Sequence, residues 1–404
     1  MTRLASEQAK MGHEVTLACL DYPHLGPQVD APALRVVSVK GNILAARGRG
    51  WSPGFRRVLL KEAQNTDIVH NHGLWMWPNA YAREAAVAAA KPLIISPRGM
   101  LESWSLNRSK LRKAVAWRLF EKRNLQSAVM FHATSGEEKN SIEEFISHRL
   151  TRMTEDSFSG GDPAGKSSLS EKAKKVPVVV APNGVDLPDL MRKPGREILE
   201  SKFPKLKDRR WVVFMSRLHP KKGIDVLLRG WARQKEESLG LLVSSSLSPV
   251  LILAGSDLIG YRKDIERMIK ELGLGDSVVI TGEVAGEEKD CLLANAEVFV
   301  LPSYSENFGI VVAEAMAWGR PVIASMGTPW QEVADVGAGW WVKPEEDALA
   351  VALAEELGKG REELDAMGAK GRALVEERYG WSVPAERLTK AYEEVLATAE
   401  RSEP

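Results

Sequence analysis

Residues 297–325 read EVFVLPSYSENFGIVVAEAMAWGRPVIAS, and this stretch decides the fold class. The apolar runs at 297–301 and 321–325 have the length and composition of buried strands. Between them, residues 310–318 are apolar except for Glu314 and predict a helix that Gly309 opens. A strand, a helix and a second strand in this order are typical of parallel α/β architecture.

The same alternation of short apolar runs and helical patterns extends through the rest of the chain. Because many of the runs lack polar alternation, they indicate parallel strands covered by helices on both faces. The remaining strand candidates are residues 14–20, 34–39, 67–70, 92–96, 128–134, 176–181, 211–216, 250–254 and 277–281. The repetition predicts an α/β protein of two doubly wound, Rossmann-like domains.

The length of 404 residues also fits two domains, of roughly 150–200 residues each. We place their boundary in the turn-rich stretch PNGVDLPDL at 182–190, which gives domains at 1–185 and 186–383. The polar, Gly- and Ser-rich segment 151–175 predicts a mobile loop. A last helix at about 384–404 could pack on either domain, including back on the first.

The chain opens with MTRLASEQAK, an amphipathic helical pattern that ends at Gly12. An α/β domain normally begins with a strand. We therefore expect that the first strand of the N-terminal domain and the loop after it are absent. On this interpretation the chain starts downstream of the true start, or it is an impaired enzyme.

The composition limits the possible partners. A net charge of +1 produces no overall electrostatic field that would attract nucleic acid. A hydrophobic content of 44% is sufficient for a folded core. The two cysteines lie far apart in sequence, which favours a reducing compartment. With no apolar run near the roughly 18 residues that cross a bilayer and no secretory leader, we expect a cytoplasmic protein.

The sequence lacks the patterns that are typical of several kinds of functional site. No CxxC or HExxH spacing occurs, so zinc has no support, and we expect neither a metal nor another cofactor. No G-x-G-x-x-G follows a strand candidate, which disfavours a nicotinamide dehydrogenase.

Glu306 and Glu314 lie on the loop and helix that follow strand 297–301. The first N–H groups of a helix can bind an anion, and open α/β sheets bind ligands at the carboxyl ends of their strands. This segment therefore offers two carboxylates beside an anion site. Alternatively, Glu314 is buried in a pair with a core cation and Glu306 is a solvated loop residue.

Arg217 and Lys222 follow strand 211–216, in the segment WVVFMSRLHPKKGIDVLL at 211–228. Two cations at the carboxyl end of a strand could neutralise a diphosphate. The alternative is an ordinary charged loop. Together, the cations and the carboxylates match a sugar nucleotide, which presents both a diphosphate and hydroxyl groups.

These segments closely resemble the retaining family-4 glycosyltransferases of the GT-B fold. The resemblance rests on the E-x7-E pattern from Glu306 to Glu314, and it covers nearly the whole chain. The supporting segments are SRLHPKKG at 216–223, PNGVD at 182–186, LILAG at 251–255 and GHEVTLACL at 12–20. The resemblance implies two facing Rossmann-like domains and a glycosyltransferase of cell-surface polysaccharide or glycolipid synthesis.

The same resemblance implies the role of each site residue. Arg217 and Lys222 would bind the diphosphate of a UDP- or GDP-sugar, Glu314 its ribose and Glu306 its sugar. Transfer would retain the anomeric configuration without a metal. Further donor contacts would come from Asn307, Phe308 and Gly309, and the base would lie near Gly282, Glu283 and Val284.

One departure from the family pattern concerns the acceptor side. Relatives carry a histidine where this chain has Arg98, in IISPRGML at 94–101. Arg98 could hold a phosphate or a sugar hydroxyl, but it cannot titrate near neutral pH. His72 and His70 could face the acceptor, or they could be structural, as we expect for His132.

Residues 98–123 contain eight Arg or Lys interleaved with apolar side chains. Such a basic amphipathic region could contact an anionic membrane from the cytoplasmic side or face a lipid-linked acceptor. The alternative is a solvated face whose apolar side packs on its own domain.

Two other functions remain open from the sequence. One is a sugar-nucleotide epimerase or hydrolase on the same scaffold, which would turn over the donor at full rate without an acceptor. The other is a non-catalytic sugar-nucleotide-binding protein, which would bind the donor and release no product.

Overall fold

The computed structural model describes residues 1–22, 31, 34–41, 49–147, 176–238 and 248–401. The chain divides into a first unit, residues 1–184 with 381–404, and a second unit, residues 185–380. The last helix therefore belongs to the first unit. The mobile loop predicted at 151–175 lies outside the described residues.

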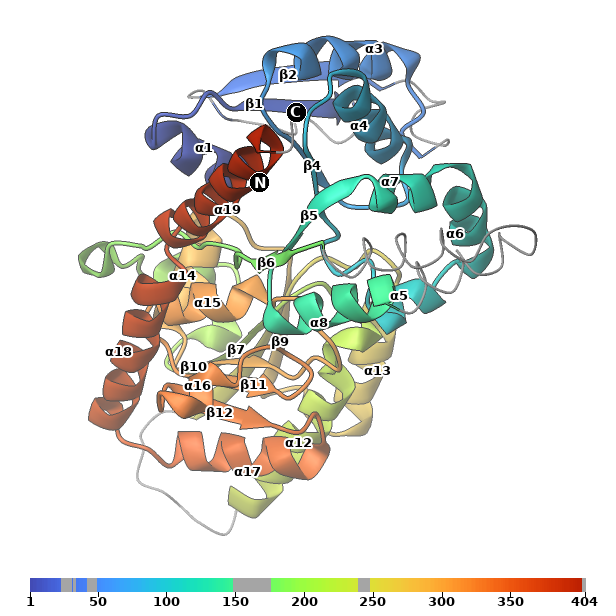
Figure 1. The fold of residues 1–404 in the computed structure, drawn as a ribbon. Helices are drawn as coiled ribbons and strands as arrows, with labels where there is room; N and C mark the ends of the chain where they lie inside the picture. Colours follow the sequence, from blue (N-terminus) through green and yellow to red (C-terminus); the bar gives the residue numbers. More distant parts are fainter. Residues whose placement is uncertain (23–30, 32–33, 42–48, 148–175, 239–247, 402–404) are drawn as a thin grey trace. The chain divides into compact units, whose positions relative to one another are not determined.

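The second unit contains one parallel sheet of six strands in the order β12-β11-β10-β7-β8-β9 (Figure 1). If the six strands are numbered 1 to 6 in chain order, starting with β7, their order across the sheet from β9 is 3-2-1-4-5-6. This is the strand order of a doubly wound sheet. The strands are β7 (Arg210–Met215), β8 (Pro249–Ala254), β9 (Val278–Gly282), β10 (Val298–Leu301), β11 (Val322–Ser325) and β12 (Gly339–Val342). The α/β prediction is confirmed here.

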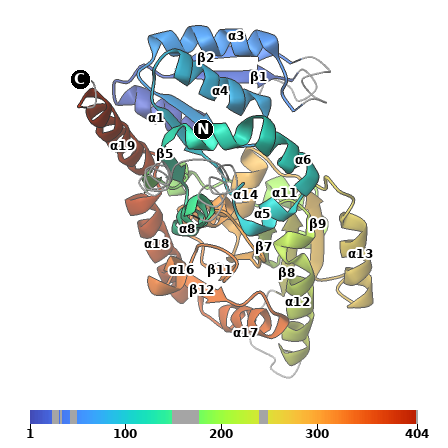
Figure 2. The same cartoon turned by 45° about the vertical axis from the view of Figure 1, so that its right-hand side comes forward.

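Helices cover this sheet, with α12 packed against α13 and α17, and α15 against α14 and α18 (Figures 1 and 2). The central strands bury their side chains on both faces, as the fully buried Phe214 and Phe299 show. The helices are α11 (Glu197–Glu200), α12 (Ile224–Ser238), α13 (Arg262–Glu271), α14 (Glu287–Asn295), α15 (Ile310–Ala317), α16 (Glu332–Asp335), α17 (Glu346–Leu357) and α18 (Arg361–Arg378).

The described strands of the first unit form two parallel sheets, β1-β2 and β3-β4-β5-β6. In a doubly wound order, the strand between β1 and β3 would be the first of the sheet. Within the described residues, neither β1 nor β2 pairs with β3. The strands are β1 (Thr16–Asp21), β2 (Arg35–Lys40), β3 (Val69–His72), β4 (Leu93–Ser96), β5 (Ala128–Ala133) and β6 (Val178–Val180).

The helix predicted at the start is present as α1 (Thr2–Lys10), and it packs against α19 (Ser382–Glu400). Leu4 of α1 shares a buried cluster with Leu388 and Ala391 of α19. Helix α3 lies beside α4 in both views (Figures 1 and 2). The other helices are α3 (Pro53–Glu62), α4 (Trp77–Ala88), α5 (Ser103–Asn107), α6 (Lys110–Ala116), the π-helix η3 (Trp117–Glu121), α7 (Lys122–Gln126) and α8 (Gly136–Phe145).

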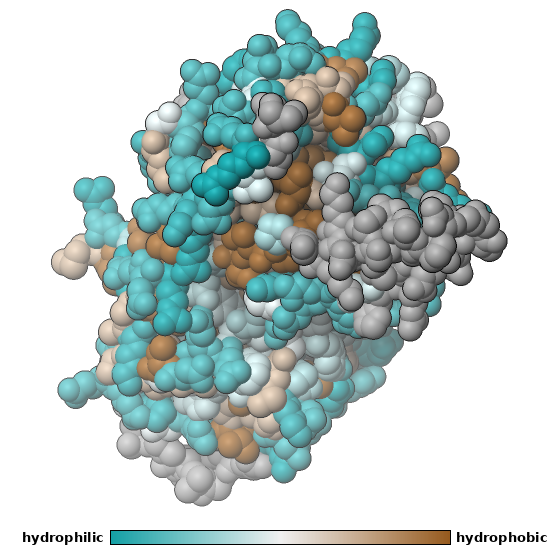
Figure 3. Space-filling view, in the orientation of Figure 1, coloured by the Kyte–Doolittle hydropathy of each residue, from teal (hydrophilic) through white to brown (hydrophobic). Residues whose placement is uncertain are grey.

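The surface seen in Figure 3 is mostly hydrophilic, with hydrophobic residues gathered in separate patches. Among the helices of the described residues, none combines the length and the apolarity that crossing a membrane requires.

Candidate functional site

The centre of the second sheet brings the two predicted donor segments together. Strands β7 and β10 are neighbours, with Val212 opposite Val298. The chain continues from β7 through α12 to β8 on one side, and from β10 through α15 to β11 on the other. Such a switch point opens a crevice at the carboxyl ends of the strands. The predicted cations follow β7, and the predicted carboxylates follow β10.

Lys222 and Glu306 form a mostly buried ion pair. The short helix η7 (Pro220–Lys222) ends at Lys222, whose Nζ donates to Oε1 of Glu306. The hydroxyl of Ser303 donates to the same oxygen over 2.8 Å. The exposed fractions of the Lys222 and Glu306 side chains are only 10% and 12%. The alternative of a solvated Glu306 is therefore wrong.

The two loops of this ion pair lie in close contact. Gly223, which follows Lys222, has φ 67°, and a Cβ atom at this position would lie 2.1 Å from the carbonyl oxygen of Pro302. The backbone N–H of Tyr304 donates to the carbonyl of Lys221 over 2.9 Å. The backbone itself therefore sets the approach of Lys222 to Glu306.

Arg217 and Glu314 line one pocket of about 210 Å³ together with Lys289. Nζ of Lys289 lies 3.0 Å from Oε1 of Glu314, and the Glu314 side chain is 23% exposed. The alternative that Glu314 pairs with a core cation is therefore right about the pairing and wrong about the core, because both partners lie on the pocket wall. Among the described residues Arg217 is exposed and has no hydrogen bond or ion pair, so a ligand can reach its guanidinium.

The end of β9 contributes to the same pocket. Strand β9 ends at Gly282, whose carbonyl accepts a hydrogen bond from the N–H of Gly255 over 2.7 Å. Glu283 and Val284 follow and line the pocket beside Arg217 and Glu314. The segment predicted to receive the base therefore shares one cavity with the ribose and phosphate candidates.

Gly309 is the N-cap of α15 and adopts a left-handed conformation, with φ 72°. Phe308 before it is buried, and its ring packs on Trp330 with 5.2 Å between centroids. Asn307 is half-buried in the same loop. Only the backbone of Phe308 can therefore serve a ligand, because its side chain belongs to the core of the second unit.

Arg98 and His72 meet in the first unit. Nη2 of Arg98 lies 3.1 Å from Nδ1 of His72, and Nη1 of Arg98 donates to Oδ1 of Asn183 over 2.7 Å. Among the described residues no carboxylate forms an ion pair with Arg98. The guanidinium is thus held by two neutral side chains and has further N–H donors for an anion.

The neighbouring histidines contact other groups of the first unit. Nε2 of His132 lies 2.8 Å from the carbonyl oxygen of Ala181, and Nδ1 of His70 lies 2.5 Å from the hydroxyl of Tyr392. Burial, and then Arg98, lowers the pKa of His132 to about 3. Burial also lowers the pKa of His70 and of His72 far below the ordinary value. All three are therefore neutral near neutral pH, and Nδ1 of His72 accepts from Arg98.

Among the charged residues that line this pocket, Lys289 is the one that was not expected from the sequence. Its only local signal is a single cation among the acidic residues that open α14. In the described part of the chain, no group of three His, Cys, Asp or Glu side chains is arranged to hold a metal ion.

Two protein-family models match the chain. Residues 195–374 match the model of "Glycosyl transferases group 1", and residues 1–151 match that of the "Glycosyl transferase 4-like domain". The first matched segment lies entirely in the second unit, and the second matched segment lies entirely in the first unit.

Curated relatives are similar over part of their length. The MMP alpha-(1->4)-mannosyltransferase of Mycolicibacterium hassiacum is 32% identical over 182 residues, which cover 44% of this chain and 41% of the relative. The GDP-mannose-dependent alpha-(1-6)-phosphatidylinositol monomannoside mannosyltransferase of Mycolicibacterium smegmatis is 31% identical over 219 residues, 52% of this chain and 54% of the relative. The matches thus span about half the length of these relatives.

A solved structure is similar over almost the whole chain. HepE of Anabaena, in complex with UDP and glucose, superposes with a TM-score of 0.68 at 17% identity, covering 97% of this chain and 96% of HepE. This likeness identifies the GT-B fold.

Proposed function

We propose a reaction for this chain, which belongs to the glycosyl transferases of group 1. It transfers a sugar from a UDP- or GDP-sugar to a glycan or lipid-linked acceptor in cell-surface polysaccharide or glycolipid synthesis. The transfer retains the anomeric configuration and uses no metal. The observation that carries the proposal is the gathering of Arg217, Lys222, Glu306 and Glu314 at the switch point of one sheet.

The cations would stabilise the leaving nucleotide. Negative charge develops on the diphosphate as the glycosidic bond breaks, and a positioned cation stabilises that charge. Arg217 offers a planar set of donors at the pocket, while Lys222 is a point charge held by Glu306. Since the ammonium of Lys222 has three N–H donors, it can bind Glu306 and a phosphate oxygen together.

The carboxylates would orient the donor. Glu314 stands on the pocket wall with Glu283 and Val284, where its oxygens can accept hydrogen bonds from ribose hydroxyls. Glu306 accepts from Lys222 and Ser303 through Oε1, and this leaves Oε2 for a hydroxyl of the donor sugar.

On the acceptor side we propose that Arg98 binds a phosphate or a sugar hydroxyl, with His72 fixing its orientation. The half-buried guanidinium has hydrogen-bond donors beyond those used by Asn183 and His72. Burial lowers the pKa of Arg98 although the carboxylate of Glu138 acts in the opposite direction, and an anionic ligand would offset the remaining cost of the charge.

Residues 98–123 would contact an anionic membrane from the cytoplasmic side. Arg108, Lys110, Arg112 and Arg118 are exposed, and among the described residues none of them forms an ion pair. The exposed Leu111 and Val115 lie between them, one helical turn apart. A surface that combines exposed cations and apolar side chains is suited to the interface of an anionic lipid bilayer.

A panel of UDP- and GDP-sugars tests the donor proposal. We expect one or a few of them to raise the thermal unfolding temperature, since ligand binding stabilises the folded state. Product analysis with lipid-linked acceptors would then identify the anomeric configuration, and the same assay with excess chelator tests the need for a metal.

Two variants test the assigned residue roles, and assays with and without an acceptor separate this function from its alternatives. Glu314→Ala and Lys222→Ala should each weaken donor binding, and unchanged affinity in both would remove the proposed roles. Donor turnover at full rate without an acceptor would instead indicate an epimerase or hydrolase. Tight donor binding with no product from any acceptor would indicate a binding protein.

A further inference from the structure

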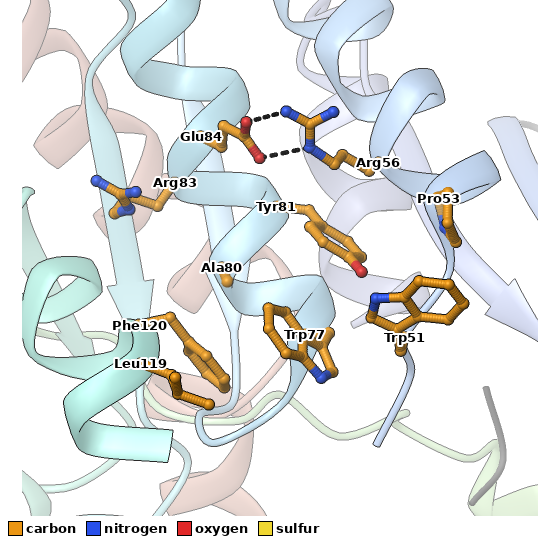
Figure 4. Close-up of a pocket in the computed structure, with 10 residues that line it drawn as sticks. All are labelled: Trp51, Pro53, Arg56, Trp77, Ala80, Tyr81, Arg83, Glu84, Leu119 and Phe120. Carbon is orange, nitrogen blue, oxygen red and sulfur yellow. Dashed lines mark hydrogen bonds and ion pairs between the residues drawn. The ribbon is translucent and has the colours of Figure 1, made fainter. Parts of the chain in front are cut away.

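A second cavity, of about 500 Å³, lies in the first unit (Figure 4). Its walls come from the start of α3, the first two turns of α4 and the end of η3. The volume lies within the roughly 300–1,000 Å³ that is usual for small-molecule sites. Leu119 and Phe120 belong to residues 98–123, which we propose to contact a membrane, but no lining residue belongs to the donor pocket.

Aromatic rings dominate the wall. The rings of Trp77 and Phe120 have centroids 5.0 Å apart, and Trp77 stacks on Tyr81 at 6.1 Å. Trp51 closes the opposite side and is 42% exposed, so this side of the wall borders solvent. These rings provide a broad apolar surface that binds hydrocarbon well.

The polar groups of the wall are mostly engaged with one another. The guanidinium of Arg56 pairs with both carboxylate oxygens of Glu84, with Nε to Oε2 at 2.7 Å (Figure 4). The hydroxyl of Tyr81 accepts from the N–H of Ser52 over 3.3 Å. A sugar needs several donors and acceptors at once, so this wall is better suited to an apolar ligand.

Arg83 is the exception. It projects from α4 on the same side as Phe120 and Leu119 (Figure 4), and its Nε–H is buried without a hydrogen-bond partner among the described residues. That N–H is closed to solvent, but the Arg83 side chain as a whole is only half-buried, so a phosphate oxygen can reach the terminal N–H groups of its guanidinium. The cavity therefore provides one anion-binding group beside its apolar wall.

The cavity also continues an exposed apolar row. Leu119 lines the cavity and is 57% exposed, and Leu111 and Val115 precede it at intervals of four residues. Exposed cations flank this row, including Lys110 and Arg118. An amphipathic ligand with a negative head would therefore meet matching surfaces along the row and in the cavity.

We propose that this cavity binds a single phosphate-bearing lipid, with its hydrocarbon against Trp77 and Phe120 and its phosphate at Arg83. The site is distinct from the donor pocket and does not require sugar transfer. Failure of this proposal would therefore leave the proposed reaction unaffected.

Isothermal titration calorimetry with monomeric ligands tests the site. Farnesyl phosphate, below its aggregation concentration, should bind at least about tenfold more tightly than farnesol or inorganic phosphate. Farnesol lacks the contact with Arg83, and inorganic phosphate lacks the contact with the aromatic rings. Dioctanoyl phosphatidylglycerol in a parallel titration distinguishes an acyl from an isoprenyl source. Binding of methyl glucoside with no binding of either lipid would overturn the proposal.

Variants of the lining residues test whether farnesyl phosphate binds in this cavity. Leu119→Glu and Arg83→Gln should each weaken farnesyl phosphate binding by about tenfold, since each removes one contact. Val351→Glu is the matched control, because Val351 is 55% exposed on α17 of the second unit. Circular dichroism checks that each variant folds. Equal affinity in Leu119→Glu, Arg83→Gln and Val351→Glu would exclude this cavity as the lipid site.

Discussion

Nζ of Lys289 lies 3.0 Å from Oε1 of Glu314, so the start of α14 supplies a cation to the carboxylate that we assign to ribose. The exposed fractions of the two side chains are 34% and 23%, which limits the energy of the pair in water. The contact therefore acts mainly by fixing the orientation of the Glu314 carboxylate in the pocket.

We expect Lys289→Met to weaken UDP- or GDP-sugar binding about fivefold, because a partly exposed ion pair contributes up to about 1 kcal/mol. Titration calorimetry with the donor identified by the panel measures the change. Lys263→Met on α13, outside the pocket lining, is the control. Equal affinity of Lys289→Met and Lys263→Met would assign Lys289 no part in binding.

The Lys222–Glu306 pair should behave as a coupled unit. Lys222→Met and Glu306→Gln should each cost about 3 kcal/mol of unfolding free energy, because each leaves one buried partner without its counterpart. The double variant should cost clearly less than the sum. Urea unfolding of the four proteins measures this coupling.

The exposed pair Lys202–Glu288 is the control for this cycle, because its side chains are 58% and 29% exposed. Its coupling should stay below about 1 kcal/mol. If the costs of Lys222→Met and Glu306→Gln were simply additive, the buried pair would have no special role in the site.

Glu121 should make stability depend on pH. Its carboxylate is fully buried and accepts from the N–H of Trp75 at 2.6 Å and from Nδ2 of Asn124 at 2.7 Å. Burial raises the pKa of Glu121 from 4.5 to about 7. The folded state therefore binds this proton more tightly than the unfolded state does. The resulting stabilisation is complete below about pH 4.5 and is lost as the pH rises through about 7.

The substitution Glu121→Gln keeps an acceptor oxygen and removes the carboxyl group that titrates. We expect the wild-type protein to lose about 3 kcal/mol more than this variant between pH 4.5 and pH 8. Urea unfolding midpoints at several pH values measure the difference. Parallel pH profiles for the two proteins would show that the carboxylate is already ionised in the folded state.

Gly255 should tolerate no side chain. Its φ is +151°, and a Cβ atom would lie 1.8 Å from the carbonyl oxygen of Ser216, on the wall of the donor pocket. Gly255→Ala should cost about 3 kcal/mol or more, through the clash and the backbone strain. It should also weaken donor binding, which calorimetry measures.

Gly260→Ala separates the clash from the backbone effect. Gly260 has φ +78° with no atom within 4 Å of an added Cβ, so the substitution should cost only roughly 1–2 kcal/mol. Similar losses at both positions would mean that the loop around Gly255 relaxes freely.

The strands of the fold could be predicted from the sequence because buried parallel strands form continuous apolar runs. All the candidates correspond to strands with ends within two residues, as for β10 and β11. Strand β12 was missed, since its four residues GWWV are all half-buried and begin with glycine. Such a short edge strand depends on pairing with β11, which no local pattern reveals.

The residues of the candidate site could also be predicted from the sequence, but the surroundings of their side chains could not. Glu314 was considered as a buried group because its helix is apolar, yet it faces a pocket beside Lys289. That contact depends on α14 and α15 packing side by side, which is a tertiary relationship. The aromatic cavity of the first unit likewise joins three segments that are separate in sequence.

The division of the first unit's described strands into two sheets has a consequence for its cooperativity. Within the described residues, β1 and β2 share backbone hydrogen bonds with each other and none with β3, so they are joined to the rest through helices such as α3 and α4. Regions held by fewer interactions open at lower free energy than the core. The amides of β1 should therefore exchange with deuterium through local opening, long before those of β4.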